Sequence, residues 1–190
     1  MRRAYHKLGA FEMTSNLMRV SDPCYNKEVW CSGAIPGCMK GKWETAVVYK
    51  DEGVFGIRVS MLAARHAPTV RSFTPCGKVW TDEKHIHYSS GWEICDFEVG
   101  VDSGQAGLFD DAHYQDSHVF DGAPKAKRDF KDVWYNHCCD LTLGPKQAGI
   151  IPFGVVSSSG YGDGGYTALC HRNSAKQVDC VVIVFLADTE

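Results

Sequence analysis

Alternating apolar and polar positions predict β-strands along most of the chain. Between Phe55 and Ala63 the odd-numbered residues are apolar, whereas Arg58 and Ser60 are polar. A period of two is typical of a strand with one face buried. Less regular versions of this pattern, or short apolar runs, mark further expected strands at 17–21, 43–50, 92–101, 150–156, 166–172 and 178–186. The last of these is apolar on both faces, which favours a central position in a sheet.

One stretch has the period of a helix instead. Within 126–141, apolar residues recur three or four positions apart, at Phe130, Val133, Trp134, His137, Cys138 and Leu141. Pro124 suits the first turn of such a helix and Gly144 its end. The sequence therefore predicts a mainly β (α+β) fold, an antiparallel β-sandwich or strongly curved sheet with one amphipathic helix at about 126–141 packed on it.

A chain of 190 residues is expected to form a single domain. Residues 1–16 have a mixed pattern and are expected to be an irregular or edge segment. The segment 66–91 contains Pro68, Pro75 and Gly77, and we interpret it as a loop-rich insertion.

Composition narrows the classes of function. A hydrophobic content of 44% and a charged content of 23% are typical of a soluble globular protein. The net charge of -3 argues against nucleic acid as a partner, because binding phosphates requires clustered positive charge. No apolar run is long enough for a membrane span, and none follows Met1 as in a signal peptide, so we expect a cytoplasmic protein. The nine cysteines form no C-x-x-C pair and are expected to be reduced.

The most unusual stretch of the sequence is a loop rich in serine and glycine, Ser157-Ser158-Ser159-Gly160-Tyr161-Gly162-Asp163-Gly164-Gly165-Tyr166. Glycines at this density permit a tight loop whose N–H groups point the same way and can hold an anion. The ordinary alternative is a hairpin turn between two strands. A similar loop, Gly100-Val101-Asp102-Ser103-Gly104-Gln105-Ala106-Gly107, follows an earlier expected strand.

Together, the two loops suggest a pocket for a small phosphorylated or nucleotide-like ligand, since hydroxyls, N–H groups and aromatic rings are what such a pocket needs. Neither loop is a P-loop, because no Gly-Lys-Ser/Thr follows. The candidate ligand-binding residues are Tyr25, Ser103, Gly104, Gln105, Ser158, Ser159, Gly160, Tyr161, Gly162, Asp163 and Tyr166.

Three carboxylates support an alternative. Asp22, Asp102 and Asp163 each follow an expected strand, and if they converge they could bind Mg²⁺ or Ca²⁺ as in a metal-dependent hydrolase. Aspartate is also a common turn residue that caps its own backbone. The pair His85 and His87, and the acidic, histidine-containing stretch 110–118, are weaker metal candidates because no standard zinc spacing is present.

No catalytic residue can be assigned. Ser103, Ser159, Cys24 and Cys139 are available nucleophiles, but the Gly-x-Ser-x-Gly motif is absent. His137 lies on the apolar stripe of the expected helix, which favours a core role.

Three motifs, taken in order, carry a resemblance. They are Val20-Ser21-Asp22-Pro23-Cys24-Tyr25, the loop at 100–107, and Ser158-Ser159-Gly160-Tyr161-Gly162-Asp163-Gly164 followed by Tyr166; Cys31, Trp43, the pair Trp134-Tyr135 and the run Cys139-Asp140-Leu141-Thr142 accompany them. With these motifs the chain, from about residue 17 onward, resembles a family of uncharacterised proteins found largely in bacteriophages and bacteria. The resemblance implies a phage origin and a shared site, but no particular reaction.

These observations lead to three hypotheses. The first is a non-enzymatic phage accessory protein in the host cytosol that binds a small phosphorylated or nucleotide-like ligand, for example by sequestering a host immune signal. The second is the metal-dependent hydrolase. The third is a protein-binding inhibitor or virion component whose partner is a host protein. Whether the chain forms a homo-oligomer is left open by the sequence.

Overall fold

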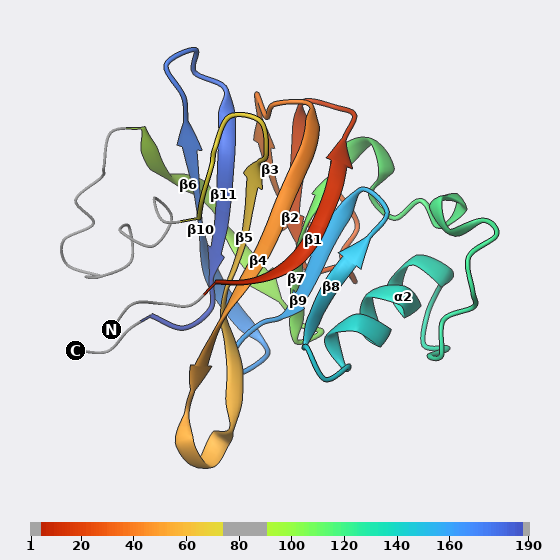
Figure 1. The fold of residues 1–190 in the computed structure, drawn as a ribbon. Coiled ribbons are helices and arrows are strands. Elements are labelled where there is room, and N and C mark those ends of the chain that lie inside the picture. Colours follow the sequence, from red (N-terminus) through yellow and green to blue (C-terminus); the bar gives the residue numbers. More distant parts are fainter. Residues whose placement is uncertain (1–4, 74–90, 188–190) are drawn as a thin grey trace.

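Two antiparallel sheets face each other across the core, and one helix lies outside them (Figure 1). The computed structural model describes residues 5–73 and 91–187. The six-stranded sheet runs in the order β1 (Tyr5–Met13), β4 (Gly41–Asp51), β5 (Ile57–His66), β11 (Val178–Val184), β10 (Gly164–Arg172) and β6 (Trp92–Val101). The five-stranded sheet runs β3 (Gly33–Pro36), β2 (Leu17–Ser21), β7 (Gln105–Asp110), β9 (Gly154–Ser158) and β8 (Ala148–Ile151). The predicted mainly β architecture is confirmed.

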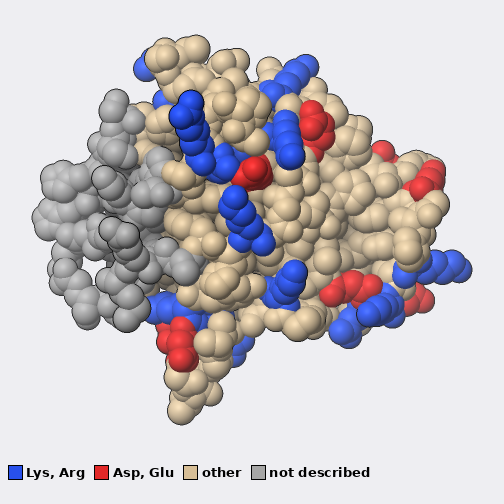
Figure 2. Space-filling view, viewed as in Figure 1, with Lys and Arg blue, Asp and Glu red and all other residues tan. Residues whose placement is uncertain are grey.

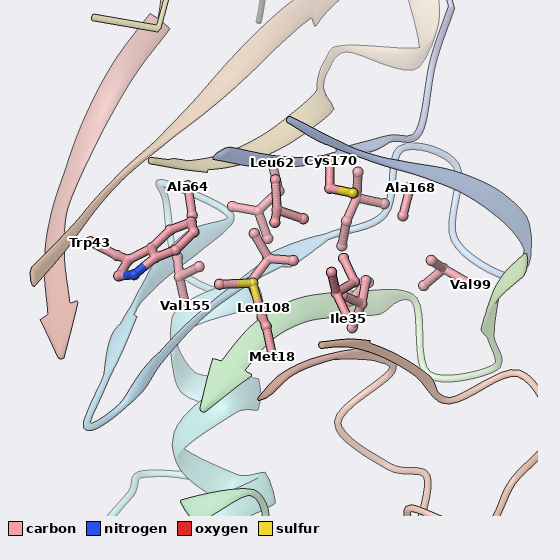
Figure 3. Packing of buried hydrophobic residues seen from close by; sticks show 14 of the residues in the cluster. Met18, Ile35, Trp43, Leu62, Ala64, Val99, Leu108, Val155, Ala168 and Cys170 are labelled. Atoms are coloured by element: carbon pink, nitrogen blue, oxygen red, sulfur yellow. The ribbon is translucent and has the colours of Figure 1, made fainter. Parts of the chain in front are cut away.

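The space between the sheets is filled by apolar side chains from both (Figure 3). Trp43 and Leu62 come from the six-stranded sheet, and Met18, Leu108 and Val155 from the other; all five are fully buried. Burying one such side chain contributes about 1.5–3 kcal/mol, so this layer is the main source of stability. The two-residue alternation of the strands determines which side chains reach it.

The chain's N-terminal part differs from its expectation. Residues Tyr5–Met13 form β1, the edge strand beside β4, so the prediction of an irregular segment was wrong for this stretch and the edge alternative describes it. The strand β1 forms by pairing with β4. A bulge between Lys7 and Gly9 interrupts its alternation of apolar and polar residues, so the sequence pattern does not reveal the strand. Of the predicted 66–91 insertion, residues 74–90 lie outside the described residues.

The apolar run 150–156, expected to be one strand, is a hairpin. β8 ends at Ile151 and β9 begins at Gly154, with Pro152 and Phe153 in the turn between them. Phe153 has φ +60°, in the left-handed region that non-glycine residues seldom adopt. Pro152 and Gly154 are the signals that mark this turn, and treating the run as uninterrupted because it is apolar missed them.

The helix, α2 (Val133–Thr142), starts later than the predicted residue 126. Its N-cap is Asp132, whose carboxylate accepts a hydrogen bond from the N–H of Tyr135 at 2.7 Å. Asn136 Oδ1 accepts from the N–H of Phe130 at 2.8 Å, which holds the preceding segment in a non-helical path. Trp134 and Cys138 are buried against the five-stranded sheet, whereas Phe130 and Val133, both expected on the buried stripe, are 62% and 50% exposed.

Three further features of the described residues concern the cysteines, membrane spans and surface charge. The cysteines in this part of the chain are free thiols. No helix in the same part has the length and apolar character needed to cross a bilayer. On the face drawn in Figure 2, cationic and anionic side chains are interspersed.

Candidate functional site

Both Ser/Gly loops are corners at which the chain crosses from one sheet to the other. Residues 102–104 connect β6 of the six-stranded sheet to β7 of the five-stranded sheet, and residues 159–163 connect β9 back to β10. The hairpin interpretation of the second loop was therefore wrong, since β9 and β10 belong to different sheets. Residues that leave one sheet and enter another need the backbone freedom that glycine provides, and Gly104, Gly160 and Gly162 all have positive φ.

The two corners lie side by side. β7 pairs with β9 so that Gln105 lies opposite Ser158, and β6 pairs with β10 so that Val101 lies opposite Gly164. The N–H of Ser159 donates to the carbonyl of Gly104 at 3.1 Å and joins one corner directly to the other. The structure thus brings together loops that are more than fifty residues apart in the sequence.

The first corner is held by the buried carboxylate of Asp22, which directly follows β2. Asp22 Oδ2 accepts from the N–H groups of Asp102 at 2.9 Å and Ser103 at 2.7 Å. Asp22 Oδ1 accepts from the Ser103 hydroxyl at 2.6 Å and from the N–H of Cys24 at 2.8 Å. Two N–H groups that the sequence suggested for an external anion are therefore bound to an anion of the protein itself.

The second corner is closed by its own residues. Ser159 Oγ donates to the carbonyl of Gly162 at 2.9 Å, and the N–H of Gly162 donates to the carbonyl of Ser159 at 2.9 Å. The Tyr166 hydroxyl donates to the same two carbonyls, at 2.8 and 2.7 Å. Gly160 has φ +61°, a conformation that favours glycine. Tyr166, predicted to contact a ligand, is thus engaged in fixing the loop.

Tyr161 belongs to the second corner, but its side chain is directed toward the β4–β5 hairpin. Its hydroxyl donates to Glu52, its ring packs edge-on against Phe55 at 5.9 Å between centroids, and the Arg58 guanidinium lies 5.8 Å above it. Glu52, Phe55 and Arg58 belong to the protruding β4–β5 hairpin (Figure 1). The Tyr161 hydrogen bond lowers the pKa of Glu52. Asp163 stays exposed at the corner.

A cavity of about 370 Å³ lies between the first corner and α2. Four of the predicted ligand-binding residues line it: Ser103, Gly104, Gln105 and Ser158. The sequence did not assign ligand binding to the other lining residues, which are Phe130, Tyr135, Cys139, Thr142 and Leu143. Three of these, Tyr135, Cys139 and Thr142, belong to motifs of the resemblance, and that was the available signal for them.

The polar groups of this first cavity are held in fixed positions. Gln105 Nε2 donates to Cys139 Sγ at 3.3 Å, and Thr142 Oγ1 donates to Gln105 Oε1 at 3.0 Å. Burial, together with hydrogen bonding to Cys139, raises the pKa of Tyr135 to about 12, so its hydroxyl is a neutral donor at pH 7. None of the described lining residues carries a charge.

A second cavity, of about 430 Å³, adjoins the first corner at Asp102. Tyr25 lines this cavity and not the first one, together with Trp30, Glu98 and the glycines at 100, 164 and 165. The predicted ligand-binding residues are therefore divided between two cavities and the second corner's internal bonds, apart from Tyr161 at the β4–β5 hairpin and the exposed Asp163.

The proposed metal ligands are not gathered into a metal centre in the described residues, where no group of three or more His, Cys, Asp or Glu side chains is placed to hold an ion. Both oxygens of Asp22 already accept two hydrogen bonds each. In the stretch 110–118, the carboxylate of Asp110 accepts hydrogen bonds from Thr14 and Ser15. His85 and His87 lie outside the described residues.

The available nucleophiles are similarly engaged. Ser103 donates its hydroxyl to Asp22, with no histidine in between, and Ser159 donates to a carbonyl. Burial and the nearby Asp22 raise the pKa of Cys24 to about 12, so this thiol is not ionised at neutral pH. His137 stacks on Phe120 with 4.0 Å between ring centroids, away from the corners' serines.

The family model of the proteins of unknown function DUF4241 matches residues 11–183. This chain belongs to the DUF4241 family. No curated protein and no solved structure matches it. The match extends from β1 to β11, so both corners, Asp22 and the two cavities all lie within the DUF4241 part of the chain.

Proposed function

We propose that this DUF4241 protein binds a small nucleotide-like ligand in the first cavity, between the Ser103 corner and α2. The observation that carries the proposal is the meeting of four predicted ligand residues with an aromatic and aliphatic rim. Ser103, Gly104, Gln105 and Ser158 form one side of the cavity, and the rim includes Phe130 and Leu143. At about 370 Å³ the cavity falls in the range for small ligands, roughly 300–1,000 Å³.

The lining suits a planar heteroaromatic group. Phe130 and Leu143 are 62% and 59% exposed, and an aromatic ring at a cavity mouth offers a face for stacking. Gln105 supplies both a donor and an acceptor, and its orientation is fixed by Cys139 and Thr142. A preoriented amide next to an apolar wall is a suitable partner for the edge of a nucleobase.

A phosphate group would lie at the rim and not in the Ser/Gly corner. The corner's amides at 102 and 103 are bound to Asp22, and the lining of the cavity is uncharged. Lys131 follows Phe130 directly, and its ammonium group donates to the carbonyl of Cys24 at 3.0 Å. Because Lys131 is next in sequence to Phe130, it is the cation we propose for the phosphate; the neighbouring Arg128 already pairs with Asp140, at 3.7 Å.

The biological form of the proposal is a phage accessory protein that sequesters a host nucleotide signal. Its support is the order of the three motifs and their resemblance to a family found in phages and bacteria. Sequestration requires tight binding without turnover, which agrees with nucleophiles that are hydrogen-bonded or protonated. The hydrolase alternative has no such support, because the described residues contain no metal-binding group of three or more side chains.

The proposal is tested by titration calorimetry against cyclic mononucleotides, cyclic dinucleotides and ADP-ribose derivatives. We expect binding of at least one compound, and weaker binding of the nucleoside that lacks its phosphate. The Phe130→Ala variant should lose at least about tenfold in affinity, which corresponds to about 1.4 kcal/mol. Phe55→Ala is the matched control, because Phe55 is 61% exposed on the β4–β5 hairpin and is not among the residues that line the cavity.

Two results would contradict the proposal. One is no binding across the whole panel with protein whose thermal unfolding is cooperative. The other is a ligand whose affinity is the same for wild-type protein, Phe130→Ala and Tyr135→Phe, since both side chains line the cavity. Product appearing during the titration would instead favour an enzyme.

A further inference from the structure

The second cavity has a floor made of backbone. Gly100, Gly164 and Gly165 line it, on the paired strands β6 and β10. A Cβ atom on Gly100 would lie 2.5 Å from Cys31 Sγ, and one on Gly165 would lie 2.3 Å from the carboxyl carbon of Glu98. Real Cβ atoms do not approach neighbours so closely, so side chains here would displace the walls of the cavity. The glycines thus allow the walls to lie close over the strands.

An aromatic residue stands exposed at this cavity. Trp30 is 81% exposed, whereas Trp43 and Trp134 are buried. Tyr25 lines the same cavity, and its ring lies 3.8 Å from the Cβ position of Gly100. An exposed tryptophan beside a second aromatic ring at a cavity is typical of a binding surface.

The charged groups of the cavity are all negative. Glu98 and Asp102 line it, and no lysine or arginine is among its described lining residues. Glu98 is exposed on β6, and within the described part of the chain it makes no ion pair or side-chain hydrogen bond. Burial, followed by hydrogen bonding to Asp102, raises the pKa of Tyr25, so the hydroxyl remains neutral and adds no charge of its own. An anion here would meet two carboxylates without a compensating charge.

We propose that the second cavity binds a small organic cation that carries ammonium groups on an alkyl chain. The ammonium group would pair with Glu98 and Asp102. The methylene groups next to it would pack on Trp30 and Tyr25, since aromatic faces attract cations. The cavity volume of about 430 Å³ is sufficient for a diamine or a quaternary ammonium compound. This site is separate from the uncharged first cavity and does not depend on the nucleotide proposal.

The test measures binding of putrescine and choline to the full chain by calorimetry and by tryptophan fluorescence, with 1,4-butanediol as the uncharged match for putrescine. We expect one or both cations to bind and to change the fluorescence, and the diol to do neither. Raising the salt concentration should weaken binding, because the carboxylates are exposed. Equal responses to putrescine and butanediol would overturn the proposal.

Three variants locate the site. Glu98→Gln and Trp30→Ala should each reduce affinity at least about tenfold. Trp30→Phe should retain most of the affinity because the ring is kept. The matched control is Glu12→Gln, at an exposed glutamate of β1. Circular dichroism checks that each variant unfolds like the wild type.

The proposal fails if Glu98→Gln binds as tightly as wild type and Glu12→Gln. It also fails if a lysine-containing peptide binds at Trp30 whereas the free amines do not, since the partner would then be a polypeptide.

Discussion

The two ends of the β2–β7 strand pair use the same device with different surroundings. Asp22 directly follows β2 and binds the corner that precedes β7, whereas Asp110 ends β7 and binds the turn that precedes β2. Both side chains belong to fully buried residues. Each turn carries the chain from the six-stranded sheet to the five-stranded sheet. A carboxylate with two oxygens can accept several N–H and O–H groups at once, so it suits a crossing point where strand pairing stops.

The difference lies in what surrounds each carboxylate. At Asp110 the donors are the backbone and hydroxyl groups of Thr14 and Ser15, together with the N–H of Ala112, and the result is a closed turn. At Asp22 the bound corner also forms walls of the two cavities, through Asp102 on one side and Ser103 on the other. The turn at Asp110 lines neither of the two cavities, so we expect it to contribute to stability alone, whereas the corner at Asp22 also shapes the proposed site.

The largest effect is expected for Asp22→Asn. An amide places an NH₂ group where Asp22 now accepts N–H and O–H donors, so at least one backbone donor loses its partner. The free energy of unfolding should fall by about 2–4 kcal/mol, as urea titration would measure. Nucleotide affinity in calorimetry should fall at least about tenfold, because the corner at Ser103 moves. Unchanged affinity in a folded variant would show that the corner does not shape the site.

Asp110→Asn should have the stability part of this effect without the binding part. Loss of acceptors for Thr14 and Ser15 should lower the free energy of unfolding by about 2–3 kcal/mol in the same urea titration. Affinity for either proposed ligand should stay within about twofold of wild type. A tenfold loss of binding here would erase the contrast between the two ends.

Strands could be predicted from the sequence more readily than contacts between residues far apart in the chain. The bounds of β2 and β6 were predicted correctly, since their alternation or flanking turns mark them. The start of α2 was missed because the helix begins at its N-cap, Asp132, although apolar residues at helical spacing continue upstream of it. The role of Asp22 was missed for a different reason: its bond to Ser103 spans 81 residues, and a short local pattern cannot reveal it.

The candidate site was predicted only in part, again because contacts between residues far apart in the sequence form it. Ser103 and Ser158 stand out because serine and glycine are concentrated around them. Tyr135 and Thr142 do not, because on a helix they look like ordinary positions, and only docking of α2 against the corner places them at the cavity.

Tyr166→Phe tests the second corner, which is closed without a carboxylate. The variant removes one hydroxyl that donates to the carbonyls of Ser159 and Gly162, at 2.8 and 2.7 Å. We expect a loss of about 1 kcal/mol in the free energy of unfolding, less than at either aspartate, because each carbonyl keeps a second donor, the N–H of Gly162 or the hydroxyl of Ser159. Hydrogen exchange at the N–H of Gly162 should become faster. A loss as large as that of Asp22→Asn would mean that the second corner is not self-supporting.

The smallest effect is a pH dependence that belongs to the Asp110 end. Burial raises the pKa of Asp110, but the hydrogen bonds from Ser15 and Thr14 outweigh it and hold the pKa below its ordinary value of 3.8. The unfolded chain therefore binds a proton at this group more readily than the folded chain does. It follows that the stabilisation is present above the ordinary pKa and is lost as the pH falls through the folded one.

Urea unfolding measured between about pH 7 and pH 3 should show stability falling at the acid end, and falling less steeply in Asp110→Asn. Other carboxylates with lowered pKa values, such as Asp111 and Glu93, titrate in both proteins, so the difference between the two curves isolates Asp110. Parallel curves would show that the turn at Thr14 and Ser15 does not depend on the charge of Asp110. The same subtraction with Asp22→Asn then measures whether stability at the other end of the strand pair also depends on the charge of its carboxylate.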